Sequence, residues 1–149
     1  MTFALSGVVD APRERVFSLT QDYERRLLWD PFLREARLVD GATRAATGAK
    51  AWCVSKGGFG METVYISFHP PGLAAVRMTR GPAALRSFAA SWRFFDLGNG
   101  KTNVCFKYFL KLRGPFALLT PLVARIFEYD TKRRLEALQR YFELSTVSS

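Results

Sequence analysis

The side chains that could carry out chemistry are few and scattered along this sequence. His69 is the only histidine, and its place beside Pro70-Pro71 predicts a surface position. A Ser-His or Cys-His nucleophile would have to use this one imidazole, and a position at a strand end argues against that role. Cys53 and Cys105 are the only cysteines and belong to no CxxC or Cys/His cluster. The sequence therefore predicts neither a metal site nor a resident cofactor.

One charged pair stands where it could act on a ligand. Asp130 and Arg134 are four residues apart in a predicted helix and project near its apolar side. Pairs at this spacing commonly do no more than stabilise a helix. The alternative is that Arg134 is partly buried beside Asp130, marks the polar end of a cavity, and meets a carboxylate, phenolate or headgroup.

Aromatic side chains give a stronger indication than the charged ones. The 149 residues include thirteen Phe, five Tyr and three Trp. In two consecutive predicted strands, such residues share a face, where they could fill a core or line an apolar cavity with a few polar points. The predicted ligand-binding residues are Met78, Phe88, Trp92, Phe94, Phe106, Tyr108, Val123, Phe127 and Arg134.

The elements that must position these residues follow from periodicity and from the turn signals. An apolar strand over residues 3–10 precedes two short helices, the second of which spans residues 23–29 and ends before Pro31. Asn99-Gly100 is the best hairpin signal. Alternation predicts strands at 34–40, 50–56, 61–68, 73–79, 86–96 and 101–112. Short turns between them imply an antiparallel sheet.

The last predicted strand and the helix after it are the clearest elements. Alternate residues from Thr102 to Leu110, with Tyr108 among them, should point inward. From Pro115 to about Glu143 the pattern is that of a long amphipathic helix, which Pro121 should kink or split. The predicted class is α+β: a curved antiparallel sheet of six or seven strands wrapped on this helix.

Composition limits the partners. The net charge is +9, from 22 basic and 13 acidic residues, yet the basic residues are dispersed and no groove-reading motif accompanies them. We therefore expect no specific nucleic-acid binding, whereas transient contact with an anionic membrane through residues 116–127 stays open. A homodimer through the strand face with Cys105 and Phe109 also stays open. Unclustered cysteines and the lack of a signal or spanning segment predict one cytoplasmic domain over residues 1–149.

Several short motifs resemble one known superfamily. They are Val9-Asp10-Ala11-Pro12 with Val16-Phe17, Asp22, Trp29-Asp30-Pro31, Pro70-Pro71, Trp92 before a glycine turn, and Thr102-Asn103-Val104 before the terminal helix. The order resembles the SRPBCC or START-like helix-grip superfamily, which joins lipid-transfer START domains, birch-pollen-allergen proteins and polyketide cyclases. The likeness extends from about Phe3 to Phe142. It implies a cavity between sheet and helix that binds lipids, hormones, flavonoids or polyketide chains.

Two functions fit this resemblance. The first is a non-enzymatic carrier or sensor of a hydrophobic small molecule. The second is a polyketide cyclase or aromatase, in which Tyr108, Asp130 or Arg134 would move protons for a chain folded in the cavity. The absence of a tuned histidine or a carboxylate pair in the strands favours the carrier.

Overall fold

The computed structural model describes residues 2–147, with side chains as far as Leu144. The chain starts with strand β1 (Thr2–Val9) and two short helices, α1 (Arg13–Thr20) and α2 (Arg26–Trp29). Six further strands follow: β2 (Leu33–Val39), β3 (Lys50–Ser55), β4 (Gly60–His69), β5 (Leu73–Arg80), β6 (Leu85–Asp96) and β7 (Thr102–Leu112). A 3₁₀ helix, η1 (Gly114–Leu119), then leads into the long helix α3 (Thr120–Val147).

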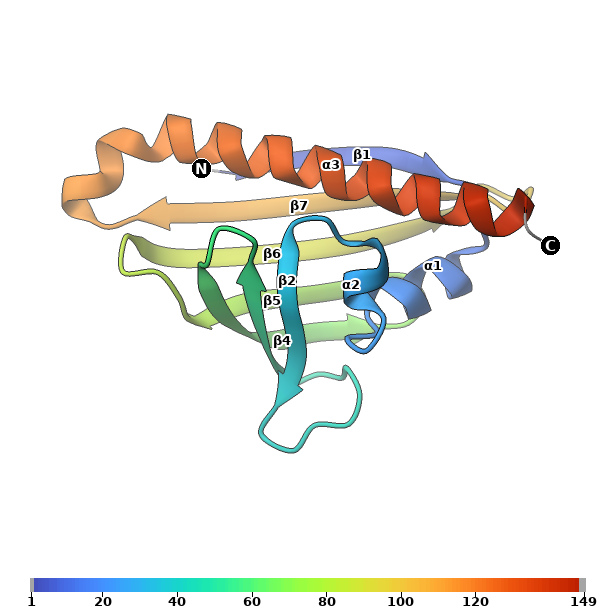
Figure 1. The fold of residues 1–149 in the computed structure, drawn as a ribbon, viewed down its shortest axis with the longest axis horizontal. Coiled ribbons are helices and arrows are strands. Elements are labelled where there is room, and N and C mark those ends of the chain that lie inside the picture. The colour runs from blue at the N-terminus through green and yellow to red at the C-terminus, as the bar shows by residue number, and fades with distance from the viewer. Residues whose placement is uncertain (1, 148–149) are drawn as a thin grey trace.

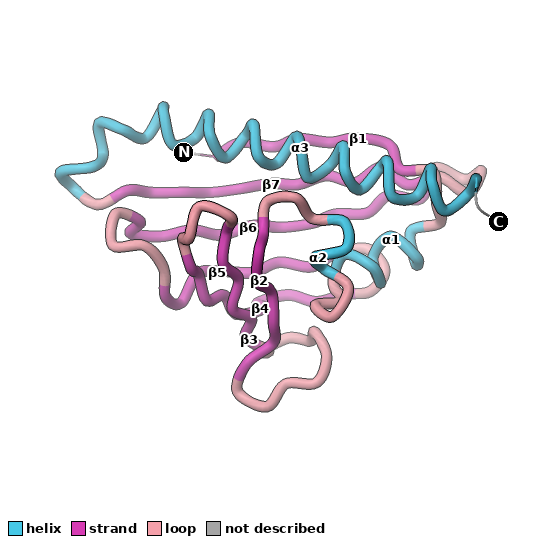
Figure 2. Tube along the Cα trace, viewed as in Figure 1, coloured by secondary structure: helices cyan, strands magenta, loops and turns pink. Residues whose placement is uncertain are grey.

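The strands form one antiparallel sheet of seven in the order β1-β7-β6-β5-β4-β3-β2. Its first strand therefore pairs with its last, and the intervening strands follow as a meander. The sheet twists strongly, so that β2 stands almost upright in the view of Figure 1 while β6 and β7 run across it. Helix α3 extends along β1 and β7 (Figure 1), and α1 and α2 lie towards its C-terminal end (Figure 2). The predicted helix-grip architecture is confirmed.

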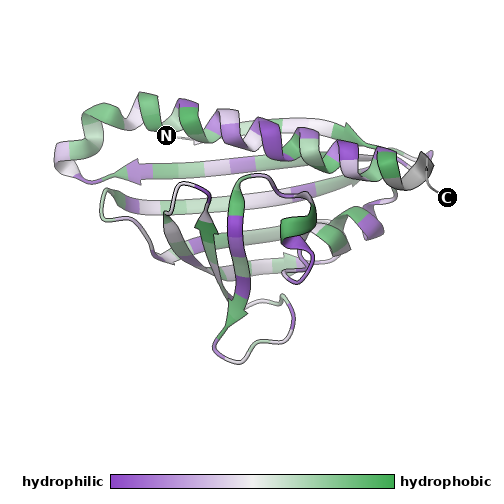
Figure 3. Ribbon diagram, in the orientation of Figure 1, coloured by the Kyte–Doolittle hydropathy of each residue, from purple (hydrophilic) through white to green (hydrophobic). Residues whose placement is uncertain are grey.

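Alternation along β7 explains which face of the sheet is buried. Val104, Phe106 and Leu110 have no exposed surface, whereas Lys107 and Lys111 at the intervening parity are exposed. Successive side chains of a strand point to opposite faces, so one apolar row lines the interior. Helix α3 shows a corresponding alternation of hydropathy along its length in Figure 3. The inward face predicted from the sequence is confirmed.

Helix α3 approaches β1 closely at one glycine. A Cβ atom at Gly7 would lie only 2.9 Å from Cδ2 of Leu135. Beside this contact, Nε2 of Gln139 donates a hydrogen bond to the carbonyl oxygen of Val8 at 2.9 Å. The missing side chain at Gly7 thus lets the helix settle on the sheet.

Local chemistry explains where α3 and α2 begin. Pro121 occupies the first turn of α3, where its missing N–H has no helical acceptor, so η1 is split off as predicted. The second short helix is shorter than predicted. Residues 23–25 form a turn instead, because Oδ1 of Asp22 accepts a hydrogen bond from the Glu24 N–H at 3.0 Å.

Within residues 2–147, no helix is both long and apolar enough to cross a bilayer.

Candidate functional site

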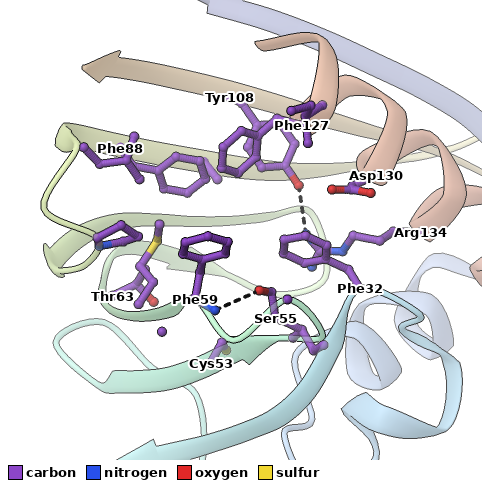
Figure 4. A pocket seen from close by; sticks show the side chains of 18 of the residues that line it. Phe32, Cys53, Ser55, Phe59, Thr63, Phe88, Tyr108, Phe127, Asp130 and Arg134 are labelled. Carbon is purple, nitrogen blue, oxygen red and sulfur yellow. Dashed lines mark hydrogen bonds between the residues drawn. The ribbon is translucent and has the colours of Figure 1, made fainter. Parts of the chain in front are cut away.

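A cavity of about 610 Å³ lies between the concave face of the sheet and α3. In Figure 4, Phe88, Tyr108 and Phe127 form one wall, and the rings of Phe32 and Phe59 lie opposite them. The lining residues come from η1 and α3, from β2 to β7, from the segments around α2, and from the β3–β4 and β5–β6 turns. Most of that lining is apolar or aromatic, and polar groups gather near Arg134.

The register of β6 and β7 creates the space. Phe88, Ala90 and Trp92 alternate along β6, and Ala90 lies directly opposite Tyr108 of β7. The methyl group of Ala90 leaves a gap between two large rings. The Phe88 ring closes one side of this gap, with its centroid 5.7 Å from that of Tyr108 and 5.6 Å from that of Phe127.

A buried charge cluster forms the inner end of the cavity. Nε of Arg26 donates to Oδ2 of Asp30 at 2.9 Å. Arg134 directs Nε and Nη2 at the same oxygen, at 3.1 and 3.0 Å. The other oxygen, Oδ1, accepts a hydrogen bond from the Phe32 N–H at 2.9 Å. One carboxylate that is fully withdrawn from solvent is therefore shared by two guanidinium groups.

The cluster stays ionised at neutral pH. Burial alone would raise the pKa of Asp30, but Arg134 and Arg26 outweigh it and hold that pKa below its usual range. Burial opposes the charge of Arg26 as well, yet the attraction of Asp30 leaves the pKa of this guanidinium raised. Asp30 is consequently an anchor for two cations and not a proton acceptor.

Aromatic rings pack against the faces of the two guanidinium groups, and hydrogen bonds are made at their edges. Arg26 lies over the rings of Trp29 and Trp92, with its Cζ 5.2 and 5.3 Å from their centroids. Arg134 lies 5.4 Å from the ring centroid of Phe32 and 5.9 Å from that of Trp92. Such faces attract cations and screen them from water, which fixes the geometry of the cluster.

The Tyr108 hydroxyl extends the polar end into the cavity. Nη1 of Arg134 donates to this oxygen at 3.3 Å, a contact drawn as a dashed line in Figure 4. Because the hydroxyl accepts from Arg134, its own proton is free to point at a molecule in the cavity. Asp130 lies close by in Figure 4, and burial raises its pKa.

A second polar group belongs to the same end. The Tyr65 hydroxyl donates to Oε1 of Gln21 at 2.7 Å and lies 3.1 Å from the Tyr23 hydroxyl. Since the proton of Tyr65 is used on Gln21, Tyr23 acts as the donor to Tyr65. Burial raises the pKa of both phenols and that of the Cys53 thiol, so all three remain protonated at neutral pH.

The structure places most, but not all, of the predicted lining residues around the cavity. Those in the lining are Phe88, Trp92, Tyr108, Val123, Phe127, Asp130 and Arg134. Met78, Phe94 and Phe106 were predicted as well, and the structure places them outside this lining. The ring centroid of Phe94 lies 5.2 Å from that of Phe17, and the ring centroid of Phe106 lies 3.8 Å from that of Trp92. Met78 packs against Gly81.

The predicted partner of Arg134 also needs correction. Among the described side chains, its ion pair is made with Asp30 and not with Asp130. The reason is geometric, because Arg134 points from α3 towards α2 and reaches a carboxylate that is 104 positions away in the sequence. Helical periodicity reveals only neighbours on the same helix, so it offered Asp130.

Sequence reasoning missed several residues of the site. Asp30 was read only as part of the motif Trp29-Asp30-Pro31, and Arg26 only as one of many dispersed arginines. Their spacing of four residues was the available signal for a pair. Phe32 and Phe59 lie outside the strands at their positions in the chain, so alternation could not assign them to the cavity.

The residues of the described region bring together no group of three or more His, Cys, Asp or Glu side chains that could hold a metal ion. The functional groups of the cavity lining are guanidinium, ammonium, phenol, hydroxyl, amide, carboxyl and thiol groups around an apolar space.

Residues 1–143 match the family model described as "Polyketide cyclase / dehydrase and lipid transport". The chain belongs to this family. No match was found among the curated proteins.

Solved structures share the fold at low sequence identity. A START superfamily protein from Mycobacterium smegmatis is 14% identical, with a TM-score of 0.82 over 96% of this chain and 97% of its own. The Zhui aromatase/cyclase from Streptomyces is also 14% identical, with a TM-score of 0.81 over 96% and 93%. The di-domain ARO/CYC protein BexL is 14% identical, with a TM-score of 0.79 over 98% of this chain. This chain spans only 47% of the length of BexL.

Proposed function

We propose that this member of the family binds a hydrophobic small molecule in the cavity between the sheet and α3, as a carrier or sensor. The observation that supports this most is the combination of an apolar space of about 610 Å³ with one buried polar end. An apolar wall provides affinity, and a few fixed polar groups orient the bound molecule. The side chains of that polar end, Asp30 and Arg134, are already held in place by their partners.

A second candidate is a cyclase acting on a chain in the same cavity. The Tyr108 hydroxyl favours it, because this group accepts from Arg134 and can donate its proton to a carbonyl oxygen of the ligand. Asp130 in the lining has a raised pKa and could exchange a proton. The description of the family includes both cyclase and lipid-transport members, so it fits either candidate.

The mouth suggests how such a ligand would enter. The exposed apolar residues of the lining, Phe59, Phe116, Leu119 and Ile126, mark this mouth. Leu118, which is 92% exposed, lies between two of them in η1. No acidic residue occurs between Asp96 and Glu128, whereas Lys111, Arg113 and Arg125 lie in that span. An apolar tip with basic neighbours fits the surface of an anionic membrane, from which we propose that the ligand is exchanged.

Native mass spectrometry of the purified protein tests the proposal. We expect an additional mass held without a covalent bond, and saturable uptake of the neutral dye N-phenyl-1-naphthylamine by protein stripped of that mass. A carrier returns the ligand unchanged after incubation, whereas a cyclase returns a cyclised product. This product is an isomer of equal mass and a different fragmentation pattern after ring closure alone, and its mass is lower by one water where dehydration follows. Protein that carries no extra mass and takes up no dye contradicts both candidates.

A further inference from the structure

The polar end of the cavity offers hydrogen-bond donors that no protein group uses. A guanidinium has five N–H donors. Arg134 directs Nε and Nη2 at Asp30, and one N–H of Nη1 at Tyr108. At least two of its N–H groups remain without a protein acceptor among the described residues, and the Tyr108 proton has none there either. A bound molecule with acceptor oxygens would satisfy these donors.

Most of the charged side chains around the cavity are positive, as Arg134 is. The basic lining residues are Arg26, Lys56, Arg133 and Arg134, and Asp130 is the one acidic residue of the lining. Asp30 lies behind the wall and supplies one more negative charge. Lys56 and Arg133 are exposed, so the buried charges are those of Arg26, Arg134 and Asp30. They leave an excess of one positive charge at a place where burial weakens screening by solvent. An anionic group at this end would reduce the excess.

The walls beyond the polar end are suited to flat rings. Phe88 and Phe127 line one side, and Phe32 and Phe59 face them across the space (Figure 4). Trp92 belongs to the lining as well. Aromatic side chains prefer offset or tilted contacts with other rings, which add to the burial of apolar surface. Shape and charge therefore favour the same type of occupant.

We infer that this cavity takes an aromatic molecule bearing a carboxylate or an acidic phenol, whose oxygen atoms lie against Arg134 and Tyr108. The inference rests on the proposed function and narrows it to acidic ligands. Asp130 does not replace such a group, because it forms no ion pair with Arg134 among the described side chains. Asp30 holds the Arg134 guanidinium in place, so binding needs no rearrangement of that side chain.

A matched pair of probes tests the charge. Anthracene-2-carboxylic acid and its methyl ester present the same rings, and only the acid carries a charge. Each is measured by displacement of N-phenyl-1-naphthylamine from the full chain at neutral pH. We expect the acid to bind at least about tenfold more tightly than the ester, which corresponds to ~1.4 kcal/mol. The variant Arg134→Gln should reduce this ratio to about twofold or less.

Two further variants separate the role of Arg134 from loss of fold and from a general positive field. Tyr108→Phe keeps the ring and removes the donor, so it should weaken binding of the acid by about threefold to tenfold in a folded protein. Lys132→Gln removes one positive charge from an exposed position of α3 outside the cavity lining, and it should change the ratio by less than about threefold. The Lys132→Gln variant is the matched control.

Each outcome decides between the two claims. Equal binding of acid and ester, or preference for the ester, overturns the inference and leaves the proposed function intact. The same holds if the dye binds and neither anthracene probe displaces it. If the dye does not bind either, the proposed function fails and the inference fails with it. A full acid preference retained in Arg134→Gln also overturns the assignment of that side chain.

Discussion

The two ends of the cavity are built on opposite principles. At the inner end, Arg26, Asp30 and Arg134 are 6%, 3% and 9% exposed, and each is held by hydrogen bonds, ion pairs or aromatic faces. At the mouth, apolar side chains face solvent, among them Phe59 at 68% and Ile126 at 52%. Charge is buried at one end, and apolar surface is exposed at the other.

The contrast assigns different tasks to the two ends. A buried ion pair is costly to disturb, so the inner end has one arrangement and can recognise one kind of group. An exposed apolar rim has no such constraint and can contact whatever apolar surface approaches it. The inner end therefore selects the ligand and contributes to stability, and the mouth admits the ligand with little effect on stability.

Removing the shared carboxylate should give the largest effect. Asp30→Asn leaves two buried guanidinium groups without their anion, and we expect a loss of about 3–5 kcal/mol in the free energy of unfolding. Urea denaturation measures it. The matched control is Asp22→Asn, which breaks the exposed Arg25–Asp22 pair and should cost less than about 1 kcal/mol. Equal losses in the free energy of unfolding would show that the buried cluster contributes no more stability than an exposed ion pair does.

Acid should act on the same group in the wild-type protein. The pKa of Asp30 is lowered by folding, so its stabilising contribution is present above the unfolded pKa of about 3.9 and is lost as the pH falls through the lower folded pKa. Unfolding followed by circular dichroism should therefore show a steeper loss of stability below about pH 4 in the wild type than in Asp30→Asn. Parallel curves would contradict the ionised state of Asp30.

Filling the cavity should separate binding from stability. Ala90→Phe places a ring in the gap opposite Tyr108, and we expect the affinity for N-phenyl-1-naphthylamine to fall at least about tenfold. Ala89→Phe puts the same ring on the other face of β6, outside the cavity lining, and should leave dye affinity within about twofold of the wild type. Undiminished dye binding by Ala90→Phe would show that the dye does not bind in this cavity.

The mouth should give the smallest effect and one limited to membranes. Leu118→Asp should lower co-sedimentation with vesicles that contain phosphatidylserine, and should change unfolding by less than about 0.5 kcal/mol because the side chain is 92% exposed. Leu144→Asp, near the other end of α3 and 64% exposed, is the control and should bind vesicles as the wild type does. Equal loss in both variants would mean that no particular end of the molecule docks.

The sequence indicates the fold more fully than the site, and the reason is physical. Period-two patterns and turn residues are local, so the seven strands and the inward position of Tyr108 could be predicted. The alternation of side chains along a strand does not show whether an inward side chain packs on a neighbour or lines a cavity. Phe106 and Tyr108 share a face, yet Trp92 covers the first and the second reaches the cavity.

The pairing of Arg134 with Asp30 lay beyond prediction for a related reason. Arg134 and Asp30 meet only because α3 passes over α2, a contact set by the packing of two distant segments. Helical spacing pointed to Asp130 because that residue is close in sequence. Long-range partners of a buried charge become visible only when the tertiary arrangement is known.

The most direct test of the account locates the bound molecule. We would record nuclear Overhauser effects between the ring protons of bound N-phenyl-1-naphthylamine and the methyl groups of the isotope-labelled protein. The account predicts contacts with the methyl groups of Val76, Ala90 and Val123, which line the cavity between sheet and helix. Contacts confined to exposed methyl groups such as those of Leu118, Leu122 and Leu144 would contradict it, because the dye would then bind the surface and not the cavity.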